Sequence, residues 1–161
     1  MAHSVYLETS FISECVSDRA DPVSTYRRGV SIEWWASQRT RFTCFTSVET
    51  VEELSDPEYP HSREALDLID RVPLLPITDE ALGLARLLIR EKVIPGPIRG
   101  DALHLAIAAA HRMDYVLSWN VRHLANPSKV AHLGAICLRA GILPPMIVTP
   151  DLLWEEDDEK A

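Results

Sequence analysis

Apolar positions along the chain fall into short runs typical of buried strands and longer stretches with helical spacing. The runs rich in β-branched and aromatic residues predict strands over residues 4–8, 42–46, 73–77, 115–119 and 146–148. The longer stretches predict helices from residue 11 onward and over 22–38, 48–56, 61–71, 79–90, 101–112, 122–125 and 128–140. Alternation of strands and helices predicts a three-layer α/β/α domain with a central parallel sheet of four to five strands.

Local signals fix the ends of several predicted helices. Thr9 and Ser10 offer caps for the first helix, and Asp21-Pro22 is a favourable start for the second. Gly141 is a suitable residue to end the helix over 128–140.

Two predicted helices have expected buried faces. In the helix over 22–38, we expect Ile32, Trp35 and Ala36 to point toward the core. The stretch over 101–112 (DALHLAIAAAHR) is apolar on nearly all sides, which predicts a buried helix.

Acidic and amide side chains recur where predicted strands end. Glu8 closes the first strand, Glu53 follows the second by one helical stretch, and Asn120 closes the fourth. Asp101 opens the helix that leads into that fourth strand. Ligands of parallel sheets bind outside the carboxyl ends of the strands, so we expect these four side chains at one edge of the sheet.

Length and composition are those of one globular domain. The 161 residues, 47% of them apolar and 25% charged, predict a single domain over 1–150 followed by an acidic tail over 151–161. No apolar stretch approaches the roughly 18 residues of a membrane span, and no signal peptide is evident, so we expect a cytoplasmic protein without membrane contact. The widely spaced Cys15, Cys44 and Cys137 are expected to be reduced, buried thiols.

The charge balance argues against indiscriminate nucleic-acid binding. The net charge is −8, and residues 155–160 supply half of it. An acidic chain repels phosphates unless a metal or a local basic strip offsets that repulsion. The basic residues are 13 arginines and 3 lysines, and arginine is compatible with phosphate contact without being specific to it.

A group of acids from distant positions suits hard divalent cations. Magnesium prefers oxygen ligands, and a bound cation can activate water for attack on a phosphodiester. The sequence lacks a glycine-rich phosphate loop and a G-x-S-x-G motif, so a serine hydrolase is disfavoured.

Three stretches resemble the motifs of PIN-domain proteins of the VapC toxin type. VYLETSFIS is similar to their opening strand, and TSVETVEEL to their second motif, with Ser47 and Glu53. GDALHLAIAAAHRMDYVLSWNVRHLANP resembles their third and fourth motifs together, and the resemblance spans about residues 4–127.

The resemblance implies a five-stranded PIN-like fold and a Mg²⁺- or Mn²⁺-dependent endoribonuclease acting on RNA. It further implies a protein antitoxin as partner and frequent homodimers. The implied metal and catalytic residues are Glu8, Glu53, Asp101 and Asn120. Glu8 and Asn120 depart from the pattern, since most members have Asp at the first position and many have Asp at the second.

Each candidate also has a structural interpretation. Asp101 and Glu8 could act as helix caps, and Asn120 as a turn residue with positive φ. Glu53 could belong to a solvated helix face with Glu49 and Glu52.

The remaining polar and aromatic candidates are weaker. Asp114 is a loop acid, while His104 and His123 are possible bases that more commonly hydrogen-bond locally. Thr9 and Ser118 are expected to support the pocket through their hydroxyl groups. The tryptophans at 34, 35 and 119 are expected to pack in the core or an interface rather than stack on bases.

Two other functions remain open. One is a PIN-fold binding module without catalysis, consistent with Glu8, Asn120 and the net acidity. The other is a phosphatase with an aspartate nucleophile, which lacks support because position 8 is Glu with no Asp close behind it.

Overall fold

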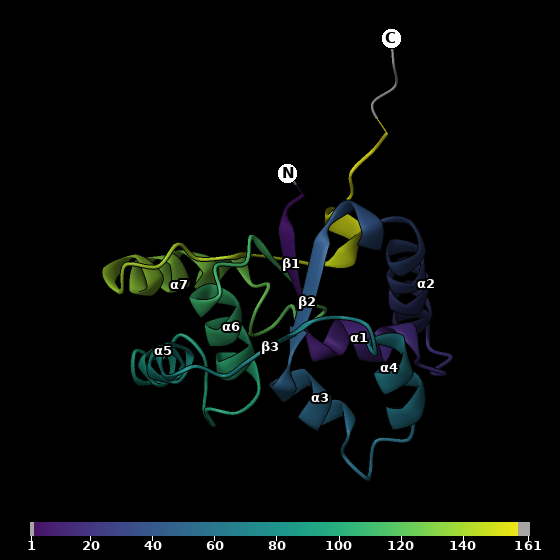
Figure 1. Cartoon of the computed structure of the whole chain (residues 1–161), viewed down its shortest axis with the longest axis horizontal. Helices are drawn as coiled ribbons and strands as arrows, with labels where there is room; N and C mark the ends of the chain where they lie inside the picture. The colour runs from purple at the N-terminus through teal and green to yellow at the C-terminus, as the bar shows by residue number, and fades with distance from the viewer. Residues whose placement is uncertain (1, 158–161) are drawn as a thin grey trace.

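The computed structural model describes residues 2–157, which form one parallel sheet covered by helices on both faces (Figure 1). The strands are β1 (Ser4–Leu7), β2 (Thr43–Ser47), β3 (Leu74–Leu75), β4 (Tyr115–Leu117) and β5 (Met146–Val148). The helices are α1 (Thr9–Cys15), α2 (Pro22–Ser37), α3 (Val48–Leu54), α4 (Ser62–Leu68), α5 (Asp79–Arg90), α6 (Asp101–Ala110) and α7 (Pro127–Arg139). Two short 3₁₀ turns, η1 (Arg39–Arg41) and η2 (Pro150–Leu152), complete these elements.

The strand order is β3-β2-β1-β4-β5, and every pairing is parallel. The chain therefore builds outward from β1 to β3 in one direction, then returns to add β4 and β5 on the other side. This reversal lies between β1 and β4, and ligands of such sheets bind outside the carboxyl ends of the strands at this position. The predicted α/β class and five-strand sheet are confirmed.

Alternate residues of the strands pack on opposite faces of the sheet. Val5 and Leu7 belong to the apolar cluster on the side of α1–α4, whereas Tyr6 belongs to the cluster on the side of α5–α7. The same alternation separates Val116 from Leu117 in β4. A strand with helices on both sides needs apolar residues at consecutive positions, which explains the continuous apolar runs in the sequence.

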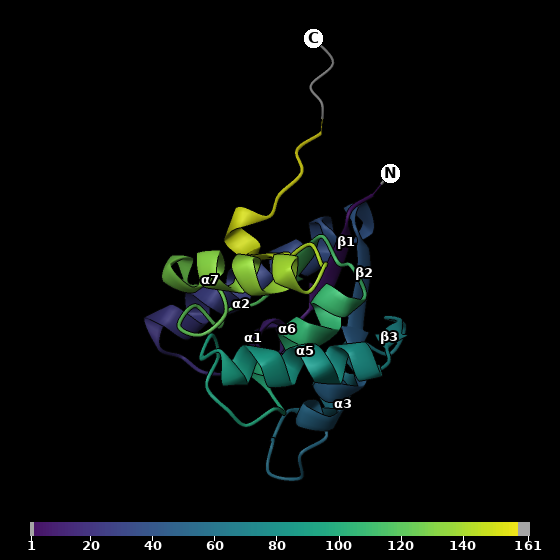
Figure 2. The ribbon, with the colours of Figure 1, turned by 90° about the vertical axis from the view of Figure 1, so that its left-hand side faces the viewer.

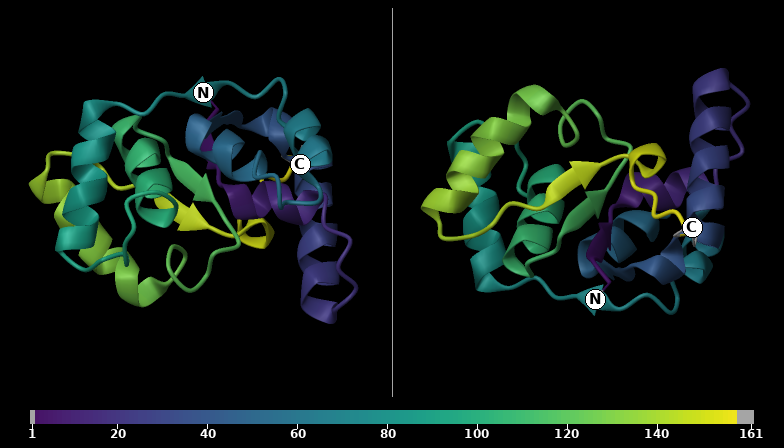
Figure 3. Two further views of the ribbon diagram at one scale, coloured as in Figure 1. Left: turned by 90° about the horizontal axis from the view of Figure 1, so that it is seen from below. Right: turned by 90° about the horizontal axis from the view of Figure 1, so that it is seen from above.

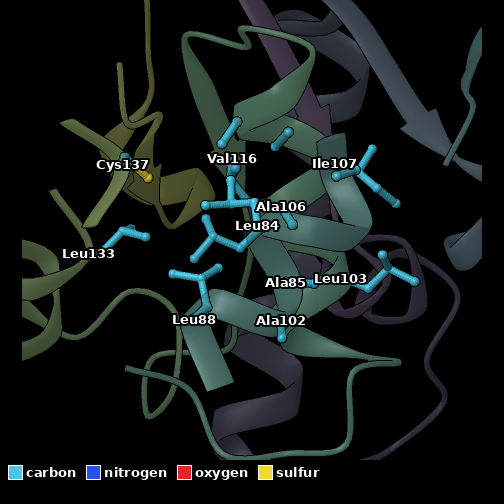
Figure 4. Close-up of a cluster of buried hydrophobic side chains, with 14 of the residues drawn as sticks. Leu84, Ala85, Leu88, Ala102, Leu103, Ala106, Ile107, Val116, Leu133 and Cys137 are labelled. Atoms are coloured by element: carbon cyan, nitrogen blue, oxygen red, sulfur yellow. The ribbon is translucent and has the colours of Figure 1, made fainter. Parts of the chain in front are cut away.

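The core under α5–α7 is built from small and branched side chains that converge from three helices and β4 (Figure 4). Leu84 and Leu88 of α5 meet Ala102 and Ala106 of α6, and the predicted burial of α6 is confirmed from Ala102 to Ala109. The alanines allow α5 and α6 to approach closely, so α6 is held firmly behind the sheet. In Figure 2, α5 and α7 face the viewer and lie in front of α6 and the sheet.

The buried face of α2 differs from the prediction. Trp34 is fully buried, whereas Ile32 is 49% exposed, Trp35 is half-buried and Ala36 is exposed. The Trp34 indole stacks on Phe42 and donates a hydrogen bond of 2.7 Å to the carbonyl of Leu153. Apolar residues of α2 do not form a single stripe, so the tertiary partners, and not the pattern, select its inner face.

One further prediction needs correction. The segment 121–125 forms turns and no helix, because Leu124 and Ala125 donate to the Asn120 carbonyl in a tight local structure. Within the segment predicted as an acidic tail, Leu153 is buried and the Glu155 amide donates to the Gln38 side chain at 2.8 Å. Tail residues 158–161 lie outside the described part.

Two predictions about helix ends are confirmed. The Asp21 carboxylate caps α2 by accepting from the Ser24 amide, and Gly141 follows α7 with φ of 75°. The three cysteines are free, although only Cys137 is fully buried. None of the helices between residues 2 and 157 is sufficiently long and apolar to cross a membrane. Figure 3 shows α2 and α7 at opposite ends of the molecule, with the sheet between them.

Candidate active site

The carboxyl ends of β1, β2 and β4 bring the predicted site residues to one edge of the sheet. Glu8 directly follows β1, and Ser118 to Asn120 follow the neighbouring β4. A second acid, Glu53, lies on α3 after β2, and α6 brings a third, Asp101, to the same edge. Hydrogen bonds link Glu8 through Ser118 and Asn120 to Asp101, and separately link Glu53 to Thr9 and His104. Within residues 2–157 no side-chain hydrogen bond joins these two groups.

Glu8 is the cap of α1, the structural role that the sequence left open for it beside the candidates Thr9 and Ser10, which lie inside the helix. Its carboxylate accepts from the Ser10 amide at 3.0 Å, from the Ser10 hydroxyl, and from the Ser118 hydroxyl at 2.8 Å. The side chain is only 5% exposed. A buried carboxylate needs such donors, and the free amides at the start of a helix supply one of them. The extra methylene of Glu, compared with Asp, is accommodated by this capping geometry.

Asp101 is the first residue of α6, while Gly100, with φ of 97°, occupies the cap position. The Asn120 side-chain amide donates to Asp101 Oδ1 at 2.9 Å. The Asn120 side-chain oxygen accepts from the His123 amide at 3.1 Å, and its backbone amide donates to Ser118 at 3.0 Å. Asn120 therefore links the β4 end to α6, without the positive φ of a strained turn.

Glu53 lies against two side chains of the site. The Thr9 hydroxyl donates to its Oε1 at 2.9 Å, and the same oxygen contacts His104 Nε2 as an ion pair. The opposite ring nitrogen of His104, Nδ1, lies 2.5 Å from the Tyr6 hydroxyl, which lies 2.7 Å from Ser47 Oγ. A continuous line of polar contacts thus runs from the end of β2 through β1 and α6 to Glu53.

The ion pair between His104 and Glu53 shifts the pKa of both side chains. Burial disfavours the charged form of His104, but the Tyr6 hydroxyl, the hydrogen bond to Glu53 and the charge of Glu8 outweigh it and raise the pKa well above 6.5. For Glu53, burial opposes ionisation, but the hydrogen bond and charge of His104 and the Thr9 hydroxyl hold its pKa below 4.5. Both shifts favour the charged forms of the two partners.

His104 and Tyr6 are the members of the network that the sequence analysis undervalued. His104 was interpreted as a possible base or a local hydrogen-bonding residue, and Tyr6 as part of a strand. Both ring nitrogens of His104 are occupied and the side chain is fully buried, which suits a structural cation better than a base exposed to substrate. The available signal was the spacing of three residues between Asp101 and His104, which places them on one face of α6.

Other candidate acids have different partners. Asp114 accepts from the Ser4 amide at 2.9 Å, at the opposite end of β1 from Glu8. Glu49, only 2% exposed, and Glu52 both contact Arg99. None of these pairings includes Glu8, Glu53, Asp101 or Asn120.

The tryptophans pack within the fold, as the sequence analysis predicted. Trp34 and Trp119 are buried, and the Trp119 indole donates to Ser31 at 2.7 Å. Trp35 is half-buried and carries the Arg39 guanidinium over its ring.

The donor set fits a hard divalent cation in its chemistry. Glu8, Glu53 and Asp101 each use one carboxylate oxygen in the hydrogen bonds above, and among residues 2–157 the second oxygen of each has no hydrogen-bond partner. Such oxygens are the ligands that Mg²⁺ and Mn²⁺ prefer. In this conformation, no three carboxylate, imidazole or thiol groups of residues 2–157 are gathered closely enough to hold a metal ion.

Comparisons with known proteins give structural relatives only. No family model matches the chain, and no curated protein matches its sequence. Among solved structures, the chain resembles VapC20 of Mycobacterium tuberculosis, a sarcin-ricin loop cleaving toxin, with a TM-score of 0.55 and 18% identity over 74% of this chain and 92% of that one.

Two further structures cover nearly the whole chain. VapBC2 of Rickettsia felis, solved with a DNA fragment from its promoter, gives a TM-score of 0.53 and 14% identity over 94% of this chain and 99% of that one. FitAcB of Neisseria gonorrhoeae gives a TM-score of 0.55 and 14% identity over 92% of this chain and 99% of that one. With the parallel five-stranded sheet, these likenesses show that the chain has the fold of VapC-like PIN-domain proteins.

Proposed function

We propose that this protein is a Mg²⁺- or Mn²⁺-dependent endoribonuclease of the VapC type. The observation that supports this function is the set of three carboxylates at the sheet edge, each with one oxygen held by the protein and the other without a protein partner. Oxygens that no protein group occupies are open to a ligand, and carboxylate oxygens are the ligands that hard divalent cations prefer.

Glu8, Glu53 and Asp101 would hold the metal, with the Asn120 side-chain oxygen completing the pocket. When bound, the metal would supply an activated water and offset the charge of the RNA phosphate. The Ser118 and Thr9 hydroxyls hold Glu8 and Glu53 in place, and Asn120 orients Asp101. The His104 imidazolium offsets part of the charge of Glu53, which limits repulsion within the pocket before a cation binds.

The partners in this proposal come from the family resemblance. RNA is the substrate, a protein antitoxin is the inhibitor, and the active form is a homodimer in the cytoplasm. The structural likeness to VapC20 supports a toxin-like role.

Asp101→Asn provides the decisive test, because it preserves the shape of the side chain and removes its charge. Cleavage of purified ribosomal RNA with Mn²⁺ should fall by at least 100-fold in this variant, as expected when a metal ligand is lost. Asp67→Asn on α4 removes an exposed carboxylate outside the site and should retain full activity. Equal cleavage by wild type and Asp101→Asn would overturn the proposal.

A second function is a binding module with the same fold and no turnover. It is favoured by one observation, that the acids are tied to protein partners and no three of them are gathered within the described chain. Calorimetry with Mn²⁺ distinguishes the endoribonuclease from the binding module. Binding that is lost in Glu53→Gln supports the enzyme, whereas no binding at millimolar Mn²⁺ supports the module.

A further inference from the structure

A second feature beside the candidate site is a cavity of about 420 Å³ between the end of α5 and the start of α7. Its polar lining consists of Lys92, Lys129 and His123, and the other lining residues are apolar or glycine. The described chain contributes no carboxylate to this lining. We call this feature the lysine cavity.

The lysine cavity is connected to the acids through Asn120. The His123 backbone amide donates to the Asn120 side-chain oxygen at 3.1 Å, and the Asn120 amide donates to Asp101 at 2.9 Å. Only one residue therefore stands between the wall of the lysine cavity and a proposed metal ligand. A polymer bound with one phosphate at Asp101 would place a neighbouring group within reach of the lysine cavity.

The concentration of positive charge here is unusual for this chain. The net charge is −8 and the sequence contains 3 lysines. Two of them line this single cavity, and the third, Lys160, lies outside the described residues. Among residues 2–157, no carboxylate forms an ion pair with Lys92 or Lys129. The charges are therefore available to an anion from outside the protein.

Local structure holds these groups at the cavity. Lys92 follows α5 with a positive φ of 58°, and its side chain is exposed. The Lys129 ammonium donates to the Val93 carbonyl at 3.0 Å, which uses one of its three protons. His123 Nδ1 is buried and has no hydrogen-bond partner among the described residues. An anion with several acceptor oxygens would satisfy the unused donors of the two ammonium groups.

We propose that the lysine cavity binds a backbone phosphate of the RNA next to the one that is cleaved. This inference rests on the proposed function and adds the place where the substrate is held. It also answers the electrostatic objection raised by the net charge, because two cations beside the acids offset the repulsion of a polyanion locally. An acidic peptide is the rival ligand, and connection to the acidic site favours RNA.

The test is the salt dependence of RNA binding. A short, uncleavable 2′-O-methyl oligonucleotide with a fluorescent label is titrated with the protein at several salt concentrations. Each lost phosphate contact should reduce the slope of log K against log salt by about 0.7 for a single strand, and weaken binding about fivefold at 0.1 M salt. We expect this change in Lys92→Gln and again in Lys129→Gln.

Arg63→Gln is the matched control. Arg63 is an exposed cation on α4, which lies across the sheet from α5 and α7 in Figure 1, and its loss changes the net charge equally. A thermal melt verifies that Lys129→Gln remains folded. Lys92 is exposed, so its variant tests the inference even if the other is destabilised.

The outcomes separate the two proposals. If wild type cleaves RNA and both lysine variants keep the slope of Arg63→Gln, the lysine cavity is no phosphate site and the proposed function stands. If wild type neither binds nor cleaves RNA, both proposals fail. If oligoglutamate binds with the lysine dependence expected for RNA while the oligonucleotide does not, the ligand is an acidic peptide and the inference is overturned.

Discussion

The Nδ1 atom of His104 lies 2.5 Å from the hydroxyl oxygen of Tyr6, in the fully buried layer beneath the candidate site. Since the other ring nitrogen contacts Glu53, Tyr6 controls the orientation of the side chain that forms an ion pair with that acid. A protonated imidazole donates from both nitrogens, which leaves the Tyr6 proton for Ser47 Oγ at 2.7 Å. A central β-strand therefore helps to set the charge at the pocket.

Tyr6→Phe should reduce the free energy of unfolding by about 1–2 kcal/mol, because it removes the hydroxyl and leaves a donor of His104 without a partner. Urea denaturation measures the change. Tyr26→Phe removes an exposed hydroxyl bonded to Asp151 and should change stability by less than about 0.5 kcal/mol. A Tyr6→Phe variant as stable as Tyr26→Phe would contradict the role assigned to this contact.

Stability should depend on pH through the His104–Glu53 pair. The pKa of folded His104 is raised above 6.5, so its stabilising contribution is fully present below pH 6.5 and is lost as pH rises through the folded value. The pKa of folded Glu53 is lowered, so its contribution is present above about pH 4.5 and is lost as pH falls through its folded value. The His104–Glu53 pair therefore contributes most to the free energy of unfolding between about pH 4.5 and pH 6.5.

The measurement is the difference in unfolding free energy between wild type and His104→Gln from pH 4 to pH 9. We expect that difference to be largest near pH 5–6 and to decline toward alkaline pH. His132→Gln, which alters an exposed histidine of α7, should show no such profile. A constant difference across the range would show that His104 is neutral in the folded protein.

Ser118→Ala should weaken the hold on Glu8. The Ser118 hydroxyl donates to the buried carboxylate at 2.8 Å and accepts from the Asn120 amide at 3.0 Å. Its loss leaves both groups short of a partner, so we expect a destabilisation of about 1–3 kcal/mol and a weaker affinity for Mn²⁺. Ser128→Ala, in an exposed turn of α7, is the control for both measurements. Unchanged affinity for Mn²⁺ in Ser118→Ala would contradict the role of Glu8 as a metal ligand.

The thiols should react slowly in the folded protein. Burial raises the pKa of Cys15 to about 12 and that of Cys44 to about 11. The thiolate is the reactive form, so alkylation by iodoacetamide at pH 8 should be much slower than for an unfolded thiol. Mass spectrometry should find all three cysteines labelled rapidly in 8 M urea. Rapid labelling of Cys15 under native conditions would contradict its burial.

Much of this architecture is readable from the sequence because strands buried on both faces leave long apolar runs and helix caps leave local signals. Placement of Glu8 and Asp101 at one sheet edge follows from parallel topology alone. The inner face of α2 does not follow, because Trp34 is selected by Phe42 and by the Leu153 carbonyl, both distant in sequence.

The partners of His104 were missed for the same reason. Tyr6 is 98 residues away and Glu53 is 51 residues away, and nothing local marks either contact. The lysine cavity likewise joins Lys92 and His123 only through the fold.

The central position of β1 has one consequence for how the protein could be divided. Residues before the exposed loop at 95–97 carry Glu8 and Glu53, and residues after it carry Asp101 and Asn120. The two portions meet along the β1–β4 pairing. Two separately expressed fragments cut at this loop would each contain half of the acidic pocket. Under the function proposed above, cleavage of RNA would appear only when the two fragments reassociate, so the fold would offer a reporter of the joining of two polypeptides.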